Sequence, residues 1–414
     1  MDITQQRIKK YFIIIQLLAF GSFASMNYYN VYLRSIGFDS TKIGLWGSIN
    51  GIIALITLPV WGILADKIGS PKKLYMLSMS LFAVIYAILP TIGKMTAVSF
   101  VPLYALIVVY SAIVQPTHTM QDAWMIGTCR VRGINYASIR SWGSFGFGVI
   151  AISYGFITQY WGLDIVFYMA PALIIPVLFM CRYFTSHLPG VENPPPEMGP
   201  DGQPIPREKP QKMGVSILFK NYYLMTAFIM TIVLACYSAL ITPFFPFILE
   251  HAGVPTNRLG WISGYGALVQ VIAMMIFTKF SKKVSLATVL IIAGFFGVAE
   301  NIMYALASNL GMLFISSTLW GFAMAMNVAV LPMYIYSLVP RSHAATAISF
   351  NATVTMMLSI VGNFTGGLLI NSIGLERYLY GLSIFRVVLI FLFIGTLVFG
   401  KRVLKLAVPN YADQ

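Results

Sequence analysis

Charged residues are scarce in this chain. Asp, Glu, Lys and Arg make up only 10% of its 414 residues, whereas 58% are hydrophobic. Soluble domains carry about 25% charged residues. The composition therefore excludes a soluble globular protein and indicates one that lies in a membrane.

Cysteine is also rare, and the chain lacks the spacings that carry enzyme chemistry. Its three cysteines, Cys129, Cys181 and Cys236, lie in or beside apolar segments without metal-like spacing. This pattern predicts inert core residues. The sequence contains no nucleotide-binding loop and no nucleophile–base pattern. It therefore predicts no enzyme, no cofactor and no metal site.

Long apolar runs are what the sequence has in excess. Crossing the hydrocarbon takes roughly 20 apolar residues, and twelve runs are long enough. The first follows a basic start but has no small-residue cleavage site, so we expect it to be a retained helix. The predicted fold class is an all-α membrane protein with twelve transmembrane helices. The runs lie at residues 11–33, 43–65, 74–93, 98–126, 138–160, 165–184, 222–249, 258–280, 286–307, 310–338, 345–373 and 378–400.

The positive charges are distributed as membrane topology requires. If both termini are cytoplasmic, twenty of the 27 Lys and Arg residues lie in inner segments and five in outer segments; Arg140 and Arg386 lie within spans. Positively charged loops stay in the cytoplasm, so this bias predicts a multi-pass protein of the cell membrane with both termini inside. The net charge of +14 thus reflects topology and does not indicate a nucleic-acid partner.

A proline-rich segment divides the chain into two halves. Eight prolines lie between Pro189 and Pro210, a composition typical of an extended, solvated linker. We therefore predict an N-terminal six-helix bundle over residues 1–184, a cytoplasmic linker over 185–219 and a C-terminal six-helix bundle over 220–414.

The two halves partly repeat each other. Tyr32–Trp46 and Ile248–Ile262 align without gaps at an offset of 216, which matches Gly37 with Gly253. Each copy contains the end of an odd-numbered span, a tight outer loop and the start of the next span. Duplication explains this placement, and parallel six-helix repeats with a binding site between them are a known transporter plan. We therefore expect the two bundles to be pseudo-symmetric.

The loop after the second span carries a specific motif, GILADKIGSPKK. One glycine is expected to let helices approach closely, a second to permit the turn, and the lysines to hold the loop in the cytoplasm. The full motif at this loop of a twelve-span chain closely resembles the loop signature of the major facilitator superfamily. Its residues are Gly62, Asp66, Lys67, Gly69, Lys72 and Lys73.

Within that superfamily, the chain resembles the lactose-permease-like, oligosaccharide–proton symporter branch. Asp122 and Arg140 keep the spacing of the substrate-site acid and arginine of that branch. Phe147 falls where the branch places the tryptophan on which a sugar ring stacks. The resemblance implies a substrate site in the N-terminal half and a cavity lined by spans one, four, seven and ten.

The second half departs from that branch. Where lactose permeases have an acid on span eight, the nearest polar residue here is Gln270. The histidine and the proton-carrying glutamate of their span ten fall near Trp320 and Ala323. The resemblance therefore implies neither galactoside selectivity nor that proton relay.

Asp122 and Arg140 lie on consecutive antiparallel segments, at similar distances from their shared loop. A charge inside an apolar run is costly unless it faces a partner or a water-filled cavity. We expect these two side chains to form an ion pair that lines a central polar pathway. The alternative is a surface pair, with Arg140 reaching outward to the interface.

Titratable groups deep in the spans are the candidates for proton coupling. These are Asp122, Glu300 and His118. A solute that takes over Arg140 would free Asp122 to bind a proton, so the two ligands would bind cooperatively. Glu300 and Arg386 lie at matched depths, which favours a structural pair, although Glu300 could instead face the cavity as the proton carrier. Further hydrogen-bonding groups on expected lining helices are Asn27, Tyr237 and Asn327.

Together these features predict a secondary transporter that works by alternating access, by proton symport and as a monomer in the lipid bilayer. Its small-molecule substrate would be a polar or aromatic solute, such as a glycoside, a nucleoside or an aromatic acid. One alternative is an exporter of drugs, sugars or lipid-like amphiphiles on the same fold. A second is a transport-inactive receptor or scaffold, which would need a larger soluble segment than the linker.

Overall fold

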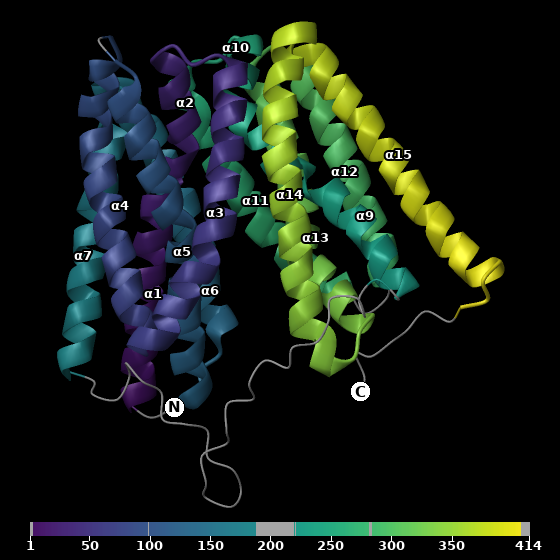
Figure 1. The fold of residues 1–414 in the computed structure, drawn as a ribbon, viewed down its shortest axis with the longest axis horizontal. Helices are drawn as coiled ribbons and strands as arrows, with labels where there is room; N and C mark the ends of the chain where they lie inside the picture. The colour runs from purple at the N-terminus through teal and green to yellow at the C-terminus, as the bar shows by residue number, and fades with distance from the viewer. Residues whose placement is uncertain (1–2, 98, 188–218, 220, 281–283, 407–414) are drawn as a thin grey trace, which may run out of the picture. The chain divides into compact units, whose positions relative to one another are not determined.

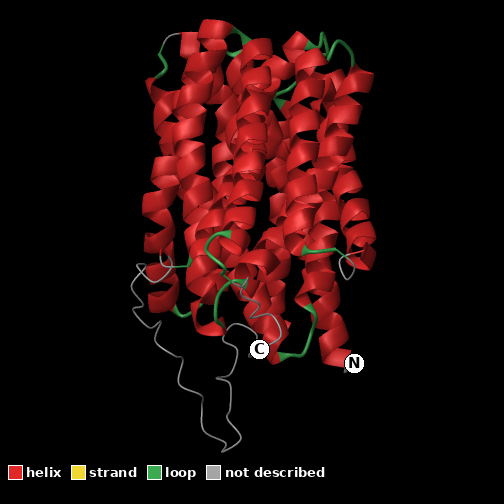
Figure 2. Ribbon diagram, turned by 90° about the vertical axis from the view of Figure 1, so that its right-hand side faces the viewer, coloured by secondary structure: helices red, strands yellow, loops and turns green. Residues whose placement is uncertain are grey.

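The fold is helical throughout the part of the chain that the structure describes. The computed structural model describes residues 3–97, 99–187, 219, 221–280 and 284–406. Within these ranges the regular elements are helices joined by short loops (Figure 2). Most of the expected linker, residues 188–218, lies outside the described residues, and residues 185–187 belong to the end of a helix.

The helices before the linker follow the predicted apolar runs (Figure 1). The first predicted span is a helix interrupted by one 3-10 turn, and the next five are continuous. Their bounds are α1 (Ile3–Phe23), η1 (Ala24–Met26), α2 (Asn27–Ser35), α3 (Ser40–Ile68), α4 (Pro71–Lys94), η2 (Met95–Ala97), α5 (Val101–Val131), α6 (Tyr136–Trp161) and α7 (Ile165–His187).

The helices after the linker follow the same plan with a more broken first member. Here the seventh span changes from α-helix to π-helix to 3-10 helix before it ends. The bounds are α9 (Tyr222–Cys236), the π-helical η3 (Tyr237–Ile241), η4 (Thr242–Phe244), α10 (Phe245–His251), η5 (Thr256–Arg258), α11 (Leu259–Phe280), α12 (Leu286–Leu306), α13 (Leu310–Ser337), α14 (Arg341–Ile373) and α15 (Leu375–Arg402).

Eleven described helices, some joined through their 3-10 or π turns, are long and apolar enough to cross a membrane. The remaining predicted span, at residues 138–160, corresponds to α6, which has 26 residues. Its first half carries Arg140 among serines and glycines, which lowers its apolar character. Length and helix order agree with the prediction of twelve spans.

The chain forms two compact units. The first comprises Met1–Tyr32 and Ile49–Gln211, and the second comprises Leu33–Ser48 and Lys212–Gln414. The end of α2 and the start of α3 therefore belong to the second unit. This division differs from the expected boundary at the linker, because these residues contact α10 and α14: Arg34 binds Glu250, and the Ser40 hydroxyl donates to the Gly367 carbonyl.

Aromatic rings fill the core of the first unit. Tyr29 and Tyr110 stack with ring centroids 4.9 Å apart. Phe82 and Phe167 both pack against Tyr86, at 4.3 and 5.3 Å. Because ring pairs add to the free energy of area burial, this cluster holds α2, α4, α5 and α7 together.

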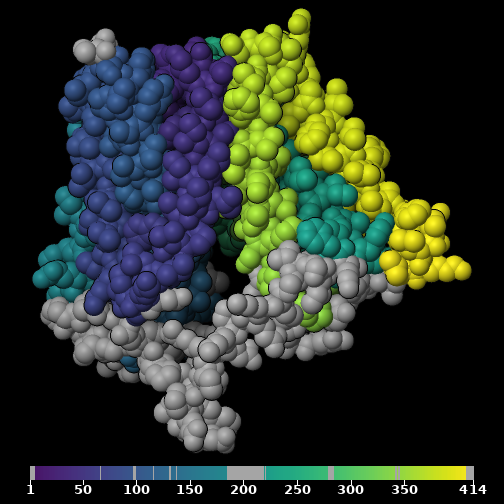
Figure 3. Space-filling model, in the orientation of Figure 1, coloured from purple at the N-terminus to yellow at the C-terminus, as the bar shows by residue number. Residues whose placement is uncertain are grey.

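Aliphatic side chains, with a few aromatic ones such as Phe228 and Phe393, fill the core of the second unit, between α9, α12, α13 and α15. α14 and α15 are seen side by side in Figure 3, with part of α9 visible between them. The outward side chains of α15 are large and apolar, and Ile384, Val388 and Phe391 are each at least 58% exposed. An exposed apolar face of this kind is expected where a helix contacts lipid.

The repeated segments adopt the same backbone turn. Gly37 has a φ of +96° and Gly253 a φ of +64°, in the left-handed region that glycine adopts without strain. The residue after each glycine donates its N–H to the carbonyl five residues earlier, at 3.0 and 2.9 Å. The sequence repeat is therefore also a structural repeat.

The loop motif between α3 and α4 forms a tight, capped turn. Gly69 has a φ of +66°, and the Ser70 hydroxyl accepts a hydrogen bond from the Lys73 N–H at 3.4 Å. This turn is the one that the motif predicts.

One expectation for the same motif fails, and one of its lysines is buried. A Cβ at Gly62 would meet no described atom within 4 Å, so this glycine does not serve a close approach. Lys72 is fully buried, with its ammonium over Trp124, whereas Lys67 and Lys73 are exposed. The side chain of Asp66 lies outside the part that the structure describes.

Two residues at equivalent positions of the repeat form an ion pair. Arg34 donates to both carboxylate oxygens of Glu250, at 2.7 and 3.0 Å, and its guanidinium also lies 4.7 Å from the ring centre of Phe247. The geometry is that of a bidentate pair, between side chains that are 34% and 46% exposed.

We expect the Arg34–Glu250 pair to contribute modestly to stability. Solvent screening limits an exposed pair to about 1 kcal/mol or less, so Arg34→Met and Glu250→Gln should each lower the melting temperature slightly. A double-mutant cycle measured by thermal unfolding should give a coupling of about 0.5–1 kcal/mol. Additive effects would show that the pair contributes nothing.

Candidate functional site

Three helices of the first unit each contribute a pair of chemically distinctive residues one turn apart. α1 carries Gln16 and Phe20, α5 carries His118 and Asp122, and α6 carries Tyr136 and Arg140. Residues four apart share one helix face, so each helix presents two of these side chains together. We call these six residues the polar cluster.

Tyr136 links two members of the polar cluster. Its hydroxyl donates to Asp122 Oδ1 at 2.5 Å and accepts a hydrogen bond from Gln16 Nε2 at 3.2 Å. Gln16 is fully buried, and its Oε1 has no hydrogen-bond partner among the described residues. The chain of contacts thus ends on a buried acceptor without a hydrogen-bond partner in the described part of the chain.

Arg140 lies on an aromatic face. Its guanidinium carbon is 4.1 Å from the ring centre of Phe20, a distance suited to a cation–π contact. The His118 ring packs 5.7 Å from Phe20 and 4.1 Å from Phe23. The contact with Phe20 orients Arg140 and leaves its N–H groups available, since cation–π attraction does not use hydrogen bonds.

The expected ion pair between Asp122 and Arg140 does not form. Within the described residues no salt bridge joins them; Asp122 binds Tyr136 and Arg140 packs on Phe20. The physical reason is that a tyrosine hydroxyl satisfies a carboxylate oxygen, and an aromatic face can hold a guanidinium. Both charged side chains are half-buried, which argues against the alternative of an exposed surface pair.

A glycine allows α6 to approach α1 at the polar cluster. A Cβ at Gly143 would lie 2.9 Å from a Phe20 ring carbon and 3.0 Å from Gln16 Oε1. Real Cβ atoms do not sit this close to a ring, so any side chain here would displace Phe20. The RSWGSFGF segment therefore contributes a glycine that allows close helix packing, as well as the charged Arg140.

Other residues expected to bind substrate lie outside the polar cluster. Asn27 begins α2 and Phe147 lies on α6; both are half-buried, and neither has a hydrogen bond or ring contact with the cluster among the described residues. Gln270, on α11, is also half-buried and does not line the cavity described next. Their roles in binding remain predictions.

The second unit contains a small buried cavity between α9, α12, α13 and α15. Its volume is about 10 Å³, at the lower limit of what can hold one water molecule. Two of the expected binding residues, Tyr237 and Asn327, line it together with Glu300, Trp320 and Arg386. The Tyr237 and Trp320 rings are 5.1 Å apart. The structure therefore brings these expected residues together.

Glu300 and Arg386 approach each other, but loosely. Both are 1% exposed, and Arg386 Nη1 lies 3.7 Å from Glu300 Oε2. Arg386 Nη1 donates instead to the Gly297 carbonyl and to Asn301 Oδ1, the latter at 3.1 Å. The expected pairing is present, as a Coulombic contact rather than a hydrogen-bonded bridge.

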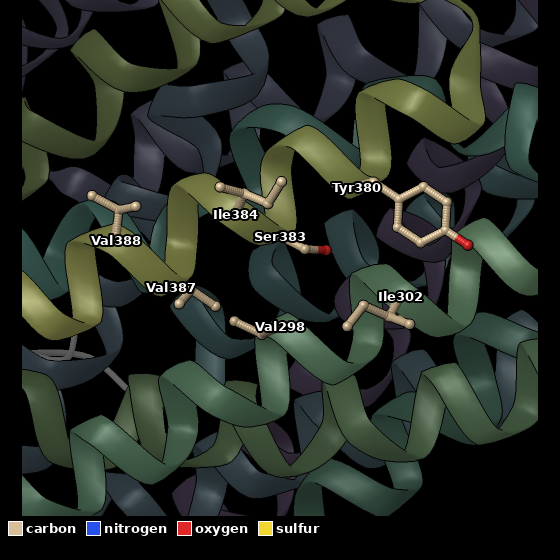
Figure 4. A pocket seen from close by; sticks show the side chains of 7 residues that line it. All are labelled: Val298, Ile302, Tyr380, Ser383, Ile384, Val387 and Val388. Atoms are coloured by element: carbon tan, nitrogen blue, oxygen red, sulfur yellow. The ribbon is translucent and has the colours of Figure 1, made fainter.

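A larger crevice of about 300 Å³ lies between α12 and α15 (Figure 4). Val298, Val387 and Val388 line it, and the Ser383 hydroxyl is used in a hydrogen bond to the Leu379 carbonyl. Ile384 and Val388 are more than half exposed. This apolar crevice suits a hydrocarbon chain and lacks the groups that a polar solute needs.

Within the described residues there is no group of three His, Cys, Asp or Glu side chains that could hold a metal ion. The features that remain are a helical, multi-pass membrane fold with buried polar groups in each unit. Many secondary transporters are built in this way, from repeated helical bundles.

Comparison with known proteins identifies the family. The chain matches the family model described as MFS_1 like over residues 11–380, and it belongs to that family, within the major facilitator superfamily. Membership places the chain among transporters of small molecules rather than among enzymes.

Similar proteins are transporters too. The uncharacterized transporter YwbF of Bacillus subtilis is 24% identical, over 87% of this chain and 84% of that protein. The maltose permease of Geobacillus stearothermophilus is 22% identical, over 90% and 87%. The multi-drug resistance efflux pump PmrA of Streptococcus pneumoniae is 22% identical, over 86% of each.

Solved structures confirm the fold. The nucleoside transporter NupG aligns with a TM-score of 0.77 and 17% identity, over 94% of this chain and 99% of that one. A bacterial homolog of the lysosomal transporter Spinster aligns with a TM-score of 0.66 and 16% identity, over 97% and 98%. The chain has the major facilitator fold.

Sequence reasoning did not select Gln16, Phe20 and Tyr136. Their spacing is the signal that could have identified them. Tyr136 lies four residues before Arg140 on α6, and Gln16 and Phe20 lie four residues apart on α1. A single tyrosine or glutamine in an apolar segment does not mark a site, so this spacing gains weight only once α1, α5 and α6 are known to meet.

Proposed function

We propose that this protein is a proton-coupled symporter of the cell membrane that takes up a small, ring-bearing polar solute, such as a glycoside or a nucleoside. The polar cluster of α1, α5 and α6 is its substrate site. The protein acts as a monomer. Both of its termini lie in the cytoplasm, and the distribution of Lys and Arg supports this orientation.

The observation that carries the proposal is the arrangement of donors, acceptors and rings in one unit. Asp122 can accept from solute hydroxyls, Arg140 can donate to ring or carbonyl oxygens, and Tyr136 can do either. The Phe20 ring holds the Arg140 guanidinium in place. Gln16 Oε1 supplies the unused buried acceptor. This combination suits a hydroxylated ring better than an apolar drug.

The printed activities of similar proteins support this class of solute. One relative is a maltose permease and one structural neighbour is a nucleoside transporter. Both solutes combine a ring with several hydroxyl groups. Binding such a solute alternately from each side of the membrane would follow the alternating-access plan of the fold.

Export is the second candidate, favoured by a different observation. One relative is a multi-drug efflux pump, and the apolar crevice between α12 and α15 could admit an amphiphile. An exporter should confer resistance to drugs such as ethidium on expressing cells. A symporter of polar solutes should not.

We expect Tyr136→Phe to weaken solute binding about tenfold, because the change removes one hydrogen bond at the Asp122 carboxylate. The measurement is the rise in melting temperature of purified protein with maltose or uridine, since a ligand of the folded state stabilises it by mass action. Tyr154→Phe is the matched control, because Tyr154 is buried on α6 outside the polar cluster. Wild-type protein stabilised by neither solute would contradict the proposed substrate class, and equal affinity in Tyr136→Phe would contradict the assigned site.

A further inference from the structure

We propose that Glu300 carries the coupling proton, and that the cavity beside it is the place where that proton is exchanged. The inference rests on the proposed function, since it assigns the coupling step of that transport. It concerns a site in the second unit, separate from the polar cluster.

The charge of Glu300 is incompletely balanced. Its nearest cation, Arg386 Nη1, is 3.7 Å from Oε2, beyond hydrogen-bonding distance, and Oε1 is buried without a hydrogen-bond partner among the described residues. The Arg34–Glu250 pair, by contrast, makes two bonds of 2.7 and 3.0 Å. A buried ion pair offsets its desolvation only when the geometry is close, so Glu300 is poorly suited to a purely structural role.

Arg386 has hydrogen-bond acceptors besides Glu300. Its Nη1 already donates to the Gly297 carbonyl and to Asn301 Oδ1. When Glu300 binds a proton, the neutral carboxyl group costs less to bury and gains an O–H donor. Arg386 then keeps its two neutral acceptors but becomes a buried cation without its counter-charge, and its Nε has no hydrogen-bond partner among the described residues. Protonation of Glu300 therefore changes the electrostatic cost of packing α12 against α15.

The cavity gives Glu300 an adjacent space for one water molecule. A volume of about 10 Å³ is enough for roughly one water molecule, which could pass a proton to or from Oε1. Trp320 lines the same cavity, and its Nε1 is also without a partner among the described atoms. Tyr237 opens the π-helical turn η3 beside it; such turns are frequent at functional sites.

The described residues that face Glu300 include no second carboxylate. α15 contributes Arg386, α9 contributes Cys236, η3 contributes Tyr237, and α12 itself contributes Tyr304. α13 contributes the uncharged Trp320 and Asn327. Among these described residues Glu300 is the one carboxylate.

Binding of the proton and binding of the solute must be coupled reciprocally. If a bound proton raises the affinity for solute by some factor, bound solute must raise the affinity of Glu300 for the proton by the same factor.

The test uses vesicles containing wild-type protein or Glu300→Gln, with maltose and uridine as probes. For one proton per neutral solute, wild type should accumulate solute about tenfold for each unit of pH difference. Glu300→Gln should lose this accumulation and keep solute exchange, whereas Glu300→Asp should retain accumulation. Glu376→Gln, a change of the same kind at an exposed position, is the control and should behave as wild type.

Accumulation by Glu300→Gln with the pH dependence of wild type would overturn the assignment of the proton to Glu300 and leave the transport function standing. Failure of wild type to accumulate either solute under a pH gradient would instead contradict the proposed function. If Glu300→Gln does not fold, Glu300→Asp decides the matter. Its pH midpoint for solute binding should shift from that of wild type, and an unchanged midpoint would count against Glu300.

A second test needs no solute, because Trp320 shares the cavity with Glu300. Titrating the pH should give a step in tryptophan fluorescence in the wild type. The step should be absent in Glu300→Gln and in Trp320→Phe, and present in Glu376→Gln. A step that persists in Glu300→Gln would show that the titrating group is a different residue.

Discussion

Arg140→Ala should abolish detectable binding of maltose and uridine, or weaken it by about 10- to 100-fold. Hydrogen bonds to charged groups contribute about 1.5–3 kcal/mol each, and Arg140 is the guanidinium that the Phe20 ring holds in the polar cluster, at 4.1 Å. The measurement is the solute-induced rise in melting temperature. Arg140→Lys should restore only part of the affinity, because an ammonium lacks the planar array of donors.

Arg258→Ala is the matched control for this change. Arg258 also lies over an aromatic ring, with its guanidinium 4.0 Å from the centre of Trp261, but it belongs to η5, in the second unit. Removing it takes away the same kind of cation–π contact without touching the polar cluster. Equal loss of affinity in both variants would show that Arg140 acts through general stability and not through the site.

Arg386→Met should destabilise the folded protein strongly. It leaves Glu300 buried without its cation, and breaking a buried pair from one side costs about 3–5 kcal/mol. The double variant Arg386→Met with Glu300→Gln should recover much of this loss, since it removes both charges. Thermal unfolding of the two variants and the wild type measures the difference.

The loss in Arg386→Met should also depend on pH. A protonated carboxyl group costs less to bury than a carboxylate, so acid should narrow the gap between Arg386→Met and wild type. Arg34→Met breaks a half-exposed pair and is the control, with an expected loss of about 1 kcal/mol or less. Similar losses from the two arginines would contradict the view that Glu300 carries a buried charge.

Helix positions and turns could be predicted from the sequence because they depend on local patterns. Long apolar runs locate the helices, and the aligned glycines Gly37 and Gly253 locate two left-handed turns. The burial of Lys72 could not be predicted from the sequence, because it depends on the packing of α4 against α5 and on the position of the Trp124 ring.

The polar cluster was predicted in part. Asp122 and Arg140 were recognised because charge is rare in apolar runs, but their partners were not. Whether two charges on neighbouring helices meet depends on how each helix is rotated about its axis, which the sequence does not specify closely. Asp122 is bound by Tyr136 instead of Arg140, and Arg140 packs on Phe20 instead of pairing with Asp122.

For Glu300 and Arg386 too, the sequence predicted that the residues are neighbours but not how their side chains bind. Matched depth in the membrane indicated that the two residues are neighbours, and the structure places them 3.7 Å apart. The sequence could not show that Arg386 would prefer Gly297 and Asn301. That preference depends on the close contact of α12 with α15, where Gly297 exposes its carbonyl to the guanidinium.

The central claim is that the polar cluster of α1, α5 and α6 binds the solute of a proton-driven transporter. The most direct test is uptake of labelled maltose and uridine by vesicles under an imposed pH gradient, with wild-type protein, Arg140→Ala and Arg258→Ala. We predict accumulation of at least one solute by wild type and by Arg258→Ala, and none by Arg140→Ala. Accumulation by Arg140→Ala at the wild-type level would contradict the claim.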